Sequence, residues 1–236
     1  MEKTALTANR FVGIDSYNDL YYIHKRSLYK KTPSNTYSFN DFQLGAIGSV
    51  DLLNPLKITI YYPDFNTVVI LDNRLNEIQR VNFNLQPPFL NVAGATTAND
   101  NRLWIFNIDS QQLELYNYRT HKQQPLSLPV SETYVTHQSN FNFCYLLTEN
   151  KLRMYNIYGS ALASLPNDSY DNFVINKERL LVSKDNQLIL ISENLSKTYF
   201  IKSPEIAIKD LYLTDDFLYL YDGEFLHKTT LTLTKN

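Results

Sequence analysis

Three aspartates stand at comparable places in the chain: Asp15, Asp51 and Asp210 lie at or beside the first apolar segment of a recurring unit of about 40 residues. Two carboxylates at a suitable separation can act as general acid and nucleophile in glycoside cleavage. The corresponding positions of two other repeats carry Ala93 and Thr136, so an acidic residue does not recur at this position in every repeat. Hydrogen bonding to turns or to a neighbouring unit's backbone is therefore the favoured interpretation.

The residues that most often bind metals are few and scattered. His24, His121, His137 and His227 are far apart, and the only cysteine, Cys144, cannot complete a structural zinc site or form an internal disulfide. Short Asp-containing turns lack the longer Asp-x-Asp-x-Asp-Gly series of a calcium loop. We expect no metal site, and the apolar surroundings of Cys144 predict a buried, inert thiol.

The motifs of several large enzyme classes are missing from the sequence. It contains no Gly-x-Ser-x-Gly elbow, no glycine-rich phosphate loop and no recognisable order of Cys and His. We therefore expect no cofactor and a protein that is not an enzyme.

The elements that would position these residues follow a six-fold repeat. In each unit two apolar, aromatic-rich runs flank a short polar turn, and further strand-like segments precede and follow them. The paired runs are 20–23 with 27–29, 58–62 with 67–71, 103–108 with 113–116, 144–147 with 152–155, 180–183 with 188–191, and 217–221 with 225–227. The preceding segments are 11–15, 50–53, 91–95, 133–136, 171–175 and 210–213, and the following ones are 36–39, 77–83, 124–128, 161–165 and 198–202.

Four short strands in about 40 residues are typical of one blade of a β-propeller. The repeat thus predicts an all-β, six-bladed propeller that occupies residues 1–236 as a single domain, with about four antiparallel strands per blade. The sixth unit lacks its last strand, and residues 3–8 form a strand-like piece before the first unit. We expect the N-terminal strand to complete the last blade and so close the ring, with 231–234 as the alternative fourth strand.

Over essentially its whole length the chain resembles bacterial β-propeller repeat proteins. The resemblance lies in the repeat itself, because the Gly-His and Trp-Asp pairs of WD repeats, the Gly-Gly doublets of kelch repeats and an Asn-His-Leu pattern are absent. It implies an architecture and no specific family, and propellers serve as enzymes and as scaffolds.

Two connections between blades interrupt the regular repeat, at residues 41–48 and 84–89. The first presents Phe42 and Leu44, and the second presents Pro87, Pro88 and Phe89. Longer loops of a propeller commonly bind its partners, so we expect these five residues to form a binding site. The alternative is that both loops only cover the apolar joints between blades.

Composition narrows the class of partner. The formal charge is -2, the pI is about 6.1, and the basic residues are scattered, so a nucleic acid is not expected. No apolar stretch reaches the roughly 18 residues of a membrane span. The polar Glu2-Lys3-Thr4 start resembles a mature N-terminus from which a signal peptide was removed, and abundant Asn, Lys and Tyr are typical of an AT-rich, Bacteroidota-like bacterium.

Together these patterns favour a non-catalytic protein-binding or scaffold propeller. We expect an accessory subunit of a cell-envelope complex, periplasmic or associated with the outer membrane, whose partner is another protein. The alternative function is a glycan-binding or glycan-cleaving propeller with Asp15, Asp51 and Asp210 at the axial channel. The alternative location is the cytoplasm.

Overall fold

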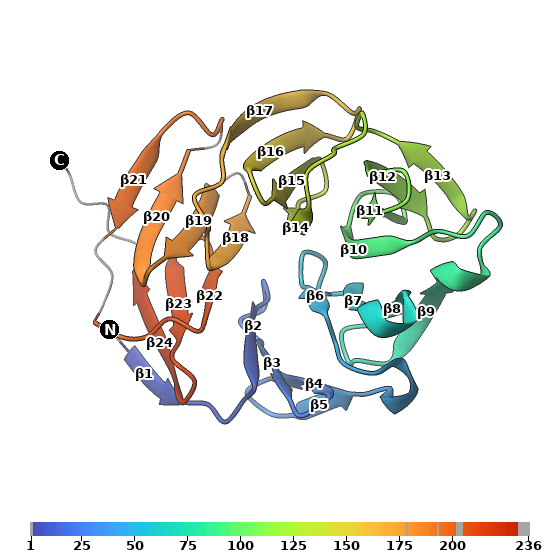
Figure 1. Ribbon diagram of the computed structural model, residues 1–236. Helices are drawn as coiled ribbons and strands as arrows, with labels where there is room; N and C mark the ends of the chain where they lie inside the picture. Colours follow the sequence, from blue (N-terminus) through green and yellow to red (C-terminus); the bar gives the residue numbers. More distant parts are fainter. Residues whose placement is uncertain (1, 178, 193, 202–204, 231–236) are drawn as a thin grey trace. The chain divides into compact units, whose positions relative to one another are not determined.

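The computed structural model describes residues 2–177, 179–192, 194–201 and 205–230. Within these ranges all regular structure is β-strand apart from three short 3-10 helices, η1 (Phe42–Leu44), η2 (Pro63–Phe65) and η3 (Phe83–Leu85). The strands form six four-stranded antiparallel sheets, labelled in Figure 1. The predicted fold class, a six-bladed β-propeller, is confirmed.

Each sheet is one blade and corresponds to one sequence repeat of about 40 residues. Blade 1 contains β2 (Arg10–Ile14), β3 (Leu20–His24), β4 (Ser27–Lys31) and β5 (Thr36–Phe39), and blade 2 contains β6 (Ser49–Asp51), β7 (Ile58–Tyr62), β8 (Thr67–Leu71) and β9 (Glu77–Asn82). Blade 3 contains β10 (Val92–Thr97), β11 (Arg102–Asn107), β12 (Gln112–Asn117) and β13 (Lys122–Pro125), and blade 4 contains β14 (Tyr134–Ser139), β15 (Phe143–Thr148), β16 (Lys151–Asn156) and β17 (Ala161–Pro166). Blade 5 contains β18 (Asn172–Asn176), β19 (Arg179–Lys184), β20 (Gln187–Ile191) and β21 (Thr198–Ile201), and blade 6 contains β22 (Asp210–Leu213), β23 (Phe217–Tyr221) and β24 (Phe225–Thr230) together with β1 (Glu2–Ala5).

The chain comprises two compact units. Unit 1 is residues 1–37 with 168–236, and unit 2 is residues 38–167. Each has its own apolar core, which stabilises it because every fully buried aliphatic side chain contributes about 1.5–3 kcal/mol. The expectation of a single domain remains a prediction.

The central strands of a blade are buried along both faces. All residues of β7 and β8 are buried, whereas β9 of the same blade is mostly exposed. A strand covered on both faces needs a continuous apolar run, and an outer strand needs none. This difference explains why the paired runs dominate the sequence pattern.

Aromatic side chains tie neighbouring blades together within each unit. In unit 2 the Tyr61 hydroxyl donates to the Val92 carbonyl oxygen, and Trp104 Nε1 donates to the Asn140 carbonyl oxygen at 3.2 Å. In unit 1 the Tyr221 hydroxyl donates to the Ala8 carbonyl oxygen at 2.8 Å. Each ring packs in the joint between two blades, and its polar atom pairs a backbone group that would otherwise lose its hydrogen bond.

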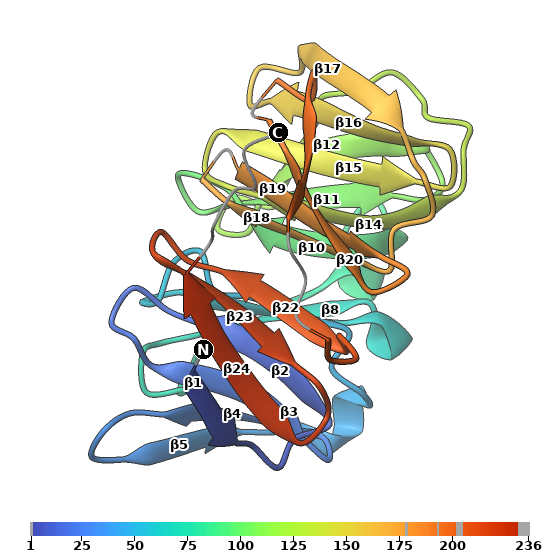
Figure 2. The ribbon, with the colours of Figure 1, turned by 90° about the vertical axis from the view of Figure 1, so that its left-hand side faces the viewer.

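The N-terminal strand completes the last blade, as predicted. β1 pairs antiparallel with β24, with Lys3 opposite His227 and Ala5 opposite Phe225, and Figure 2 shows the two strands side by side. Leu6 continues the contact through a hydrogen bond from its N–H to the Glu224 carbonyl oxygen at 2.9 Å. This pairing covers an edge of β24 that would otherwise be open. The alternative closing strand, 231–234, lies outside the described residues.

Asn and Asp side chains shape many of the tight turns. The Asn117 side chain accepts hydrogen bonds from the N–H groups of Arg119 and Thr120, both at 3.0 Å. Asp72 and Asn156 bond their own turns in the same way. These Asx turns let a chain with only six glycines reverse direction between successive strands without a glycine at each turn.

Candidate functional site

Asp15 is the centre of a buried polar network in blade 1. Its carboxylate accepts hydrogen bonds from the Tyr17 and Asp19 N–H groups at 2.9 and 3.0 Å and from the Tyr21 hydroxyl at 2.9 Å. The Lys30 ammonium lies 3.3 Å from Asp15 Oδ2 and 3.0 Å from Asp19 Oδ2. Burial, followed by the adjacent Asp15 carboxylate, raises the pKa of Tyr21. These contacts favour a structural role for Asp15.

Asp51 and Asp210 both bond the backbone of the next blade within their own unit. Asp51 Oδ2 accepts from the Thr97 N–H at 2.6 Å, and Asp210 Oδ2 accepts from the Phe11 N–H at 2.9 Å. Burial raises the pKa of both carboxyl groups, and these backbone hydrogen bonds oppose the rise. Both contacts join the innermost strands of neighbouring blades, but at different ends: Asp51 is the last residue of β6, whereas Asp210 is the first residue of β22.

The histidines occupy separate structural positions. His137 is buried in β14, where its Nδ1 lies 3.0 Å from the Tyr134 hydroxyl and its Nε2 lies 3.3 Å from the Trp104 carbonyl oxygen. Burial lowers the pKa of His137 to about 4, so the ring is neutral at pH 7. Among the described residues, no group of three or more His, Cys, Asp or Glu side chains could hold a metal ion. Cys144 is fully buried, and burial raises the pKa of its thiol.

The two interrupting loops lie at one end of the unit 2 strands and are joined by η2. A Cβ built on Gly45 would meet Asp64 of η2, and the Asn84 side chain of η3 donates to the Phe65 carbonyl oxygen at 3.1 Å. Four large apolar side chains on or beside these segments are exposed: Phe42 by 66%, Phe65 by 47%, Leu85 by 77% and Phe89 by 54%. We call these four residues the apolar loop face.

The five residues that the sequence singled out for binding have different surroundings. Phe42, Pro87, Pro88 and Phe89 are exposed, whereas Leu44 is buried beneath the loop that carries Phe42. Leu44 therefore anchors its loop and does not present a side chain to solvent. Phe65 and Leu85 were not anticipated, because each was assigned to a turn or connection without regard to where its side chain would point.

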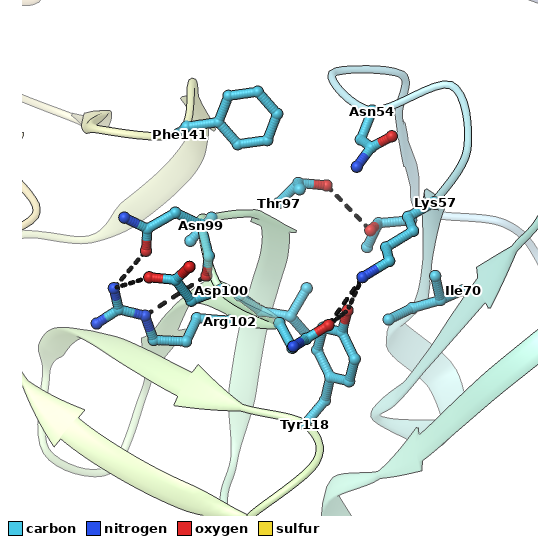
Figure 3. Close-up of a pocket in the computed structure, with 13 residues that line it drawn as sticks. Asn54, Lys57, Ile70, Thr97, Asn99, Asp100, Arg102, Tyr118 and Phe141 are labelled. Atoms are coloured by element: carbon cyan, nitrogen blue, oxygen red, sulfur yellow. Dashed lines mark hydrogen bonds and ion pairs between the residues drawn. The ribbon is translucent and has the colours of Figure 1, made fainter.

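A pocket of about 210 Å³ lies at the opposite end of the unit 2 strands (Figure 3). Asn54 and Lys57 reach it from the β6–β7 connection, residues 98–101 from the β10–β11 turn, and Phe141 from the β14–β15 turn. The Lys57 ammonium donates to Asn101 Oδ1 at 2.8 Å and to the Tyr118 hydroxyl at 3.3 Å. Thr59 and Thr97 share a hydrogen bond of 3.0 Å between their hydroxyl groups at the same pocket.

Sequence reasoning missed this pocket because its residues come from three different repeats. Lys57 and Tyr118 are 61 positions apart, and no short motif links them. One usable signal was present: Lys57 is a charged residue directly before the wholly buried strand β7.

Comparison with known proteins supports the fold alone. No protein-family model matches the chain, and no curated protein matches it. Two solved structures from the envelope or exterior of bacteria are similar: an extracellular domain assigned to a hybrid two-component system of B. thetaiotaomicron, and PorZ, a surface component of the type-IX secretion system of Porphyromonas gingivalis. Their identities are 14% and 13%, and their TM-scores are 0.62 and 0.56.

These two matches cover 98% and 97% of this chain but only 35% and 34% of the other chains, so this chain spans about a third of their length. Virginiamycin B lyase from Staphylococcus aureus is also similar, at 11% identity and a TM-score of 0.64, over 93% of this chain and 79% of the lyase. A protein named as a lyase and proteins named as extracellular or surface components thus share this fold. No helix among the described residues is long and apolar enough to cross a membrane.

Proposed function

We propose that this chain is a non-catalytic propeller that binds another protein through the apolar loop face. The observation that carries the proposal is the exposure of four large apolar side chains: Phe42 on η1, Phe65 on η2, Leu85 on η3 and Phe89 in the loop after η3. The segments η1 and η3 both lie against η2. Large apolar side chains gathered on an otherwise polar surface mark interaction sites more often than singly exposed ones do. Aromatic anchors of this kind supply much of the binding energy of protein interfaces.

The backbone beneath these side chains is held firmly. Asn66 donates to the Leu90 carbonyl oxygen at 2.6 Å, and the Phe83 N–H donates to the Asn66 carbonyl oxygen at 3.0 Å. Arg80 bridges Asp41, at 2.8 Å, and Glu77, at 2.7 Å. A surface whose loops are fixed in advance loses little conformational entropy on binding.

We also propose that the protein works in the cell envelope, as an accessory subunit of a complex. The two bacterial surface or extracellular proteins among its structural neighbours support this location. Fractionation of the source cells after osmotic shock should recover the protein with the periplasm or the outer membrane. Recovery only with the cytoplasm would contradict the proposed location without affecting the proposed binding face.

The binding proposal is tested by site-specific cross-linking in the source cells. A photo-reactive phenylalanine analogue at position 42 or 89 should cross-link to the same protein, whereas the analogue at Tyr158 should not. Tyr158 is a matched control, because it is an aromatic residue of unit 2 that is 87% exposed and lies away from the three 3-10 segments. Equal cross-linking from all three positions, or none from 42 and 89, would contradict the proposal.

A further inference from the structure

The pocket at the other end of unit 2 contains an ammonium group without a counter-charge. Lys57 donates only to neutral acceptors, the Asn101 side chain and the Tyr118 hydroxyl. None of the ion pairs between described residues includes Lys57. An ammonium has three N–H donors, so one donor of Lys57 remains for a ligand.

The single carboxylate of the pocket lining does not neutralise Lys57. Asp100 lies 3.5 Å from Arg102, and its side chain is 81% exposed. Arg102 also donates to the Asn99 carbonyl oxygen at 3.5 Å. The lining therefore carries two cations, Lys57 and Arg102, and one acid, Asp100, which is paired with Arg102 and faces solvent.

Side-chain amides add further donors. Asn54 Oδ1 accepts from the Leu56 N–H at 3.0 Å, which fixes the amide so that its NH₂ group is free to donate elsewhere. Figure 3 shows the Asn54 amide and the Lys57 ammonium extending into the same pocket. Asn101 Oδ1 accepts from both Lys57 and the Tyr118 hydroxyl, at 2.8 and 3.0 Å, so its NH₂ group is likewise free to donate.

The lining also includes apolar side chains, and the volume of the pocket limits the size of the ligand. Ile70, Leu103 and Phe141 line the pocket, and Phe141 is 41% exposed. A volume of about 210 Å³ is below the roughly 300 Å³ at which drug-sized ligand pockets begin. The pocket thus suits a molecule of a few heavy atoms with one anionic end and one apolar end.

We propose that this pocket binds a small organic carboxylate, held by Lys57 and Asn54 and covered on its apolar side by Phe141. A carboxylate matches an ammonium and an amide because each of its two oxygens can accept from a different donor. This site lies at the opposite end of the strands from the apolar loop face, and it goes beyond the proposed protein-binding function.

The test is a titration of the ¹⁵N-labelled protein followed by NMR. Propionate should produce saturable shifts of the Asn54 and Asn101 side-chain amide signals, and the neutral analogue propionamide should bind at least tenfold more weakly. Lys57→Gln should weaken propionate binding at least tenfold, since it removes the charge. Lys122→Gln, at an exposed lysine of unit 2, should leave the affinity unchanged.

Asn54→Asp provides a second variant that keeps the oxygen for the Leu56 N–H but replaces the amide donor by a carboxylate. It should abolish propionate binding while circular dichroism shows a folded protein. Equal affinity for propionate and propionamide, unchanged binding in both variants, or equally tight binding of inorganic phosphate would overturn the proposal.

Discussion

At the scale of single residues, Lys30 shows how a buried charge is tolerated. Its side chain is 4% exposed, and its ammonium lies within 3.3 Å of two carboxylates, Asp15 and Asp19, whose side chains are 0% and 12% exposed. A buried ion pair contributes little net stability, but removing one partner leaves an uncompensated charge.

Lys30→Met should therefore lower the free energy of unfolding by about 3–5 kcal/mol. Urea unfolding followed by circular dichroism measures the change. Lys31→Met is the control, because Lys31 is the next residue of β4 and is exposed. Equal losses in both variants would show that the buried network has no special role.

His137 makes stability depend on pH. Its pKa in the folded state is about 4, which is below the value of about 6.5 for a free histidine. The unfolded chain therefore takes up this proton first as the pH falls. The stabilisation is complete above pH 6.5 and is lost as the pH falls from 6.5 to 4.

We expect this group to lower the free energy of unfolding by up to about 3 kcal/mol between pH 7 and pH 4. Urea unfolding at several pH values measures the slope. His137→Gln should flatten the slope in this range. A slope that survives in His137→Gln would assign it to other groups.

At the scale of elements, the aspartates at the innermost strands act as joints between blades. Asp51 accepts from the Leu53 N–H at 2.8 Å and from the Thr97 N–H at 2.6 Å, one bond to each carboxylate oxygen. Asp51→Ala should cost about 1–3 kcal/mol, because it leaves the Leu53 and Thr97 N–H groups without a partner. Asp51→Asn should cost less, since its amide retains one acceptor.

The order of these costs is measurable by urea unfolding. The structural interpretation requires Ala to be worse than Asn. If both variants were as stable as the wild type, the contacts of Asp51 would not hold the blades together, and the alternative axial-channel role would gain weight.

Removal of the closing strand β1 should destabilise the last blade. Deletion of residues 2–5 removes β1 and opens the edge of β24, so the truncated chain should unfold at a lower temperature and self-associate. Thermal unfolding and size-exclusion chromatography measure these effects. A synthetic peptide of residues 1–9 should restore the melting temperature by adding the missing strand, and a scrambled peptide should not.

The strands were predictable from the sequence to different degrees. Ile58–Tyr62 and Phe217–Tyr221 have the bounds expected from their apolar runs, because strands buried on both faces leave a clear pattern. The outer strand β13 begins two residues before the predicted one and ends three residues before it. All four of its residues are exposed, so burial imposed no apolar residues on it that could mark its bounds.

At the scale of the whole molecule, the two candidate binding surfaces also differ in how far the sequence predicted them. The apolar loop face was partly predictable, because Phe42 and Phe89 stand in the two breaks of the repeat. The pocket was not, because Lys57 meets Asn101 across 44 positions and only the stacking of blades 2 and 3 brings them together. A repeat pattern indicates which strands form a blade, but it does not identify which turns of different blades meet.

The two surfaces lie at opposite ends of the unit 2 strands, and we therefore expect them to act independently. Phe42→Ala with Phe89→Ala should remove partner cross-linking from position 65 and leave propionate affinity within twofold of the wild type. Lys57→Gln should weaken propionate binding and leave the cross-linking unchanged. Loss of both properties in either variant would show that the surfaces are coupled or that the variant is misfolded, which circular dichroism distinguishes.

The turns give the protein a further property. Thirteen non-glycine residues of the described chain have positive φ angles, and Asn18, Asn66, Asp100, Asn101 and Asn186 are among them. A turn made by glycine presents only backbone to solvent, whereas these turns present a side chain. Point mutation can therefore change the chemistry of many loop tips while the strands behind them stay the same. In evolutionary terms, such a chain could acquire new ligands through single substitutions at its rims, without insertions and without rebuilding its core.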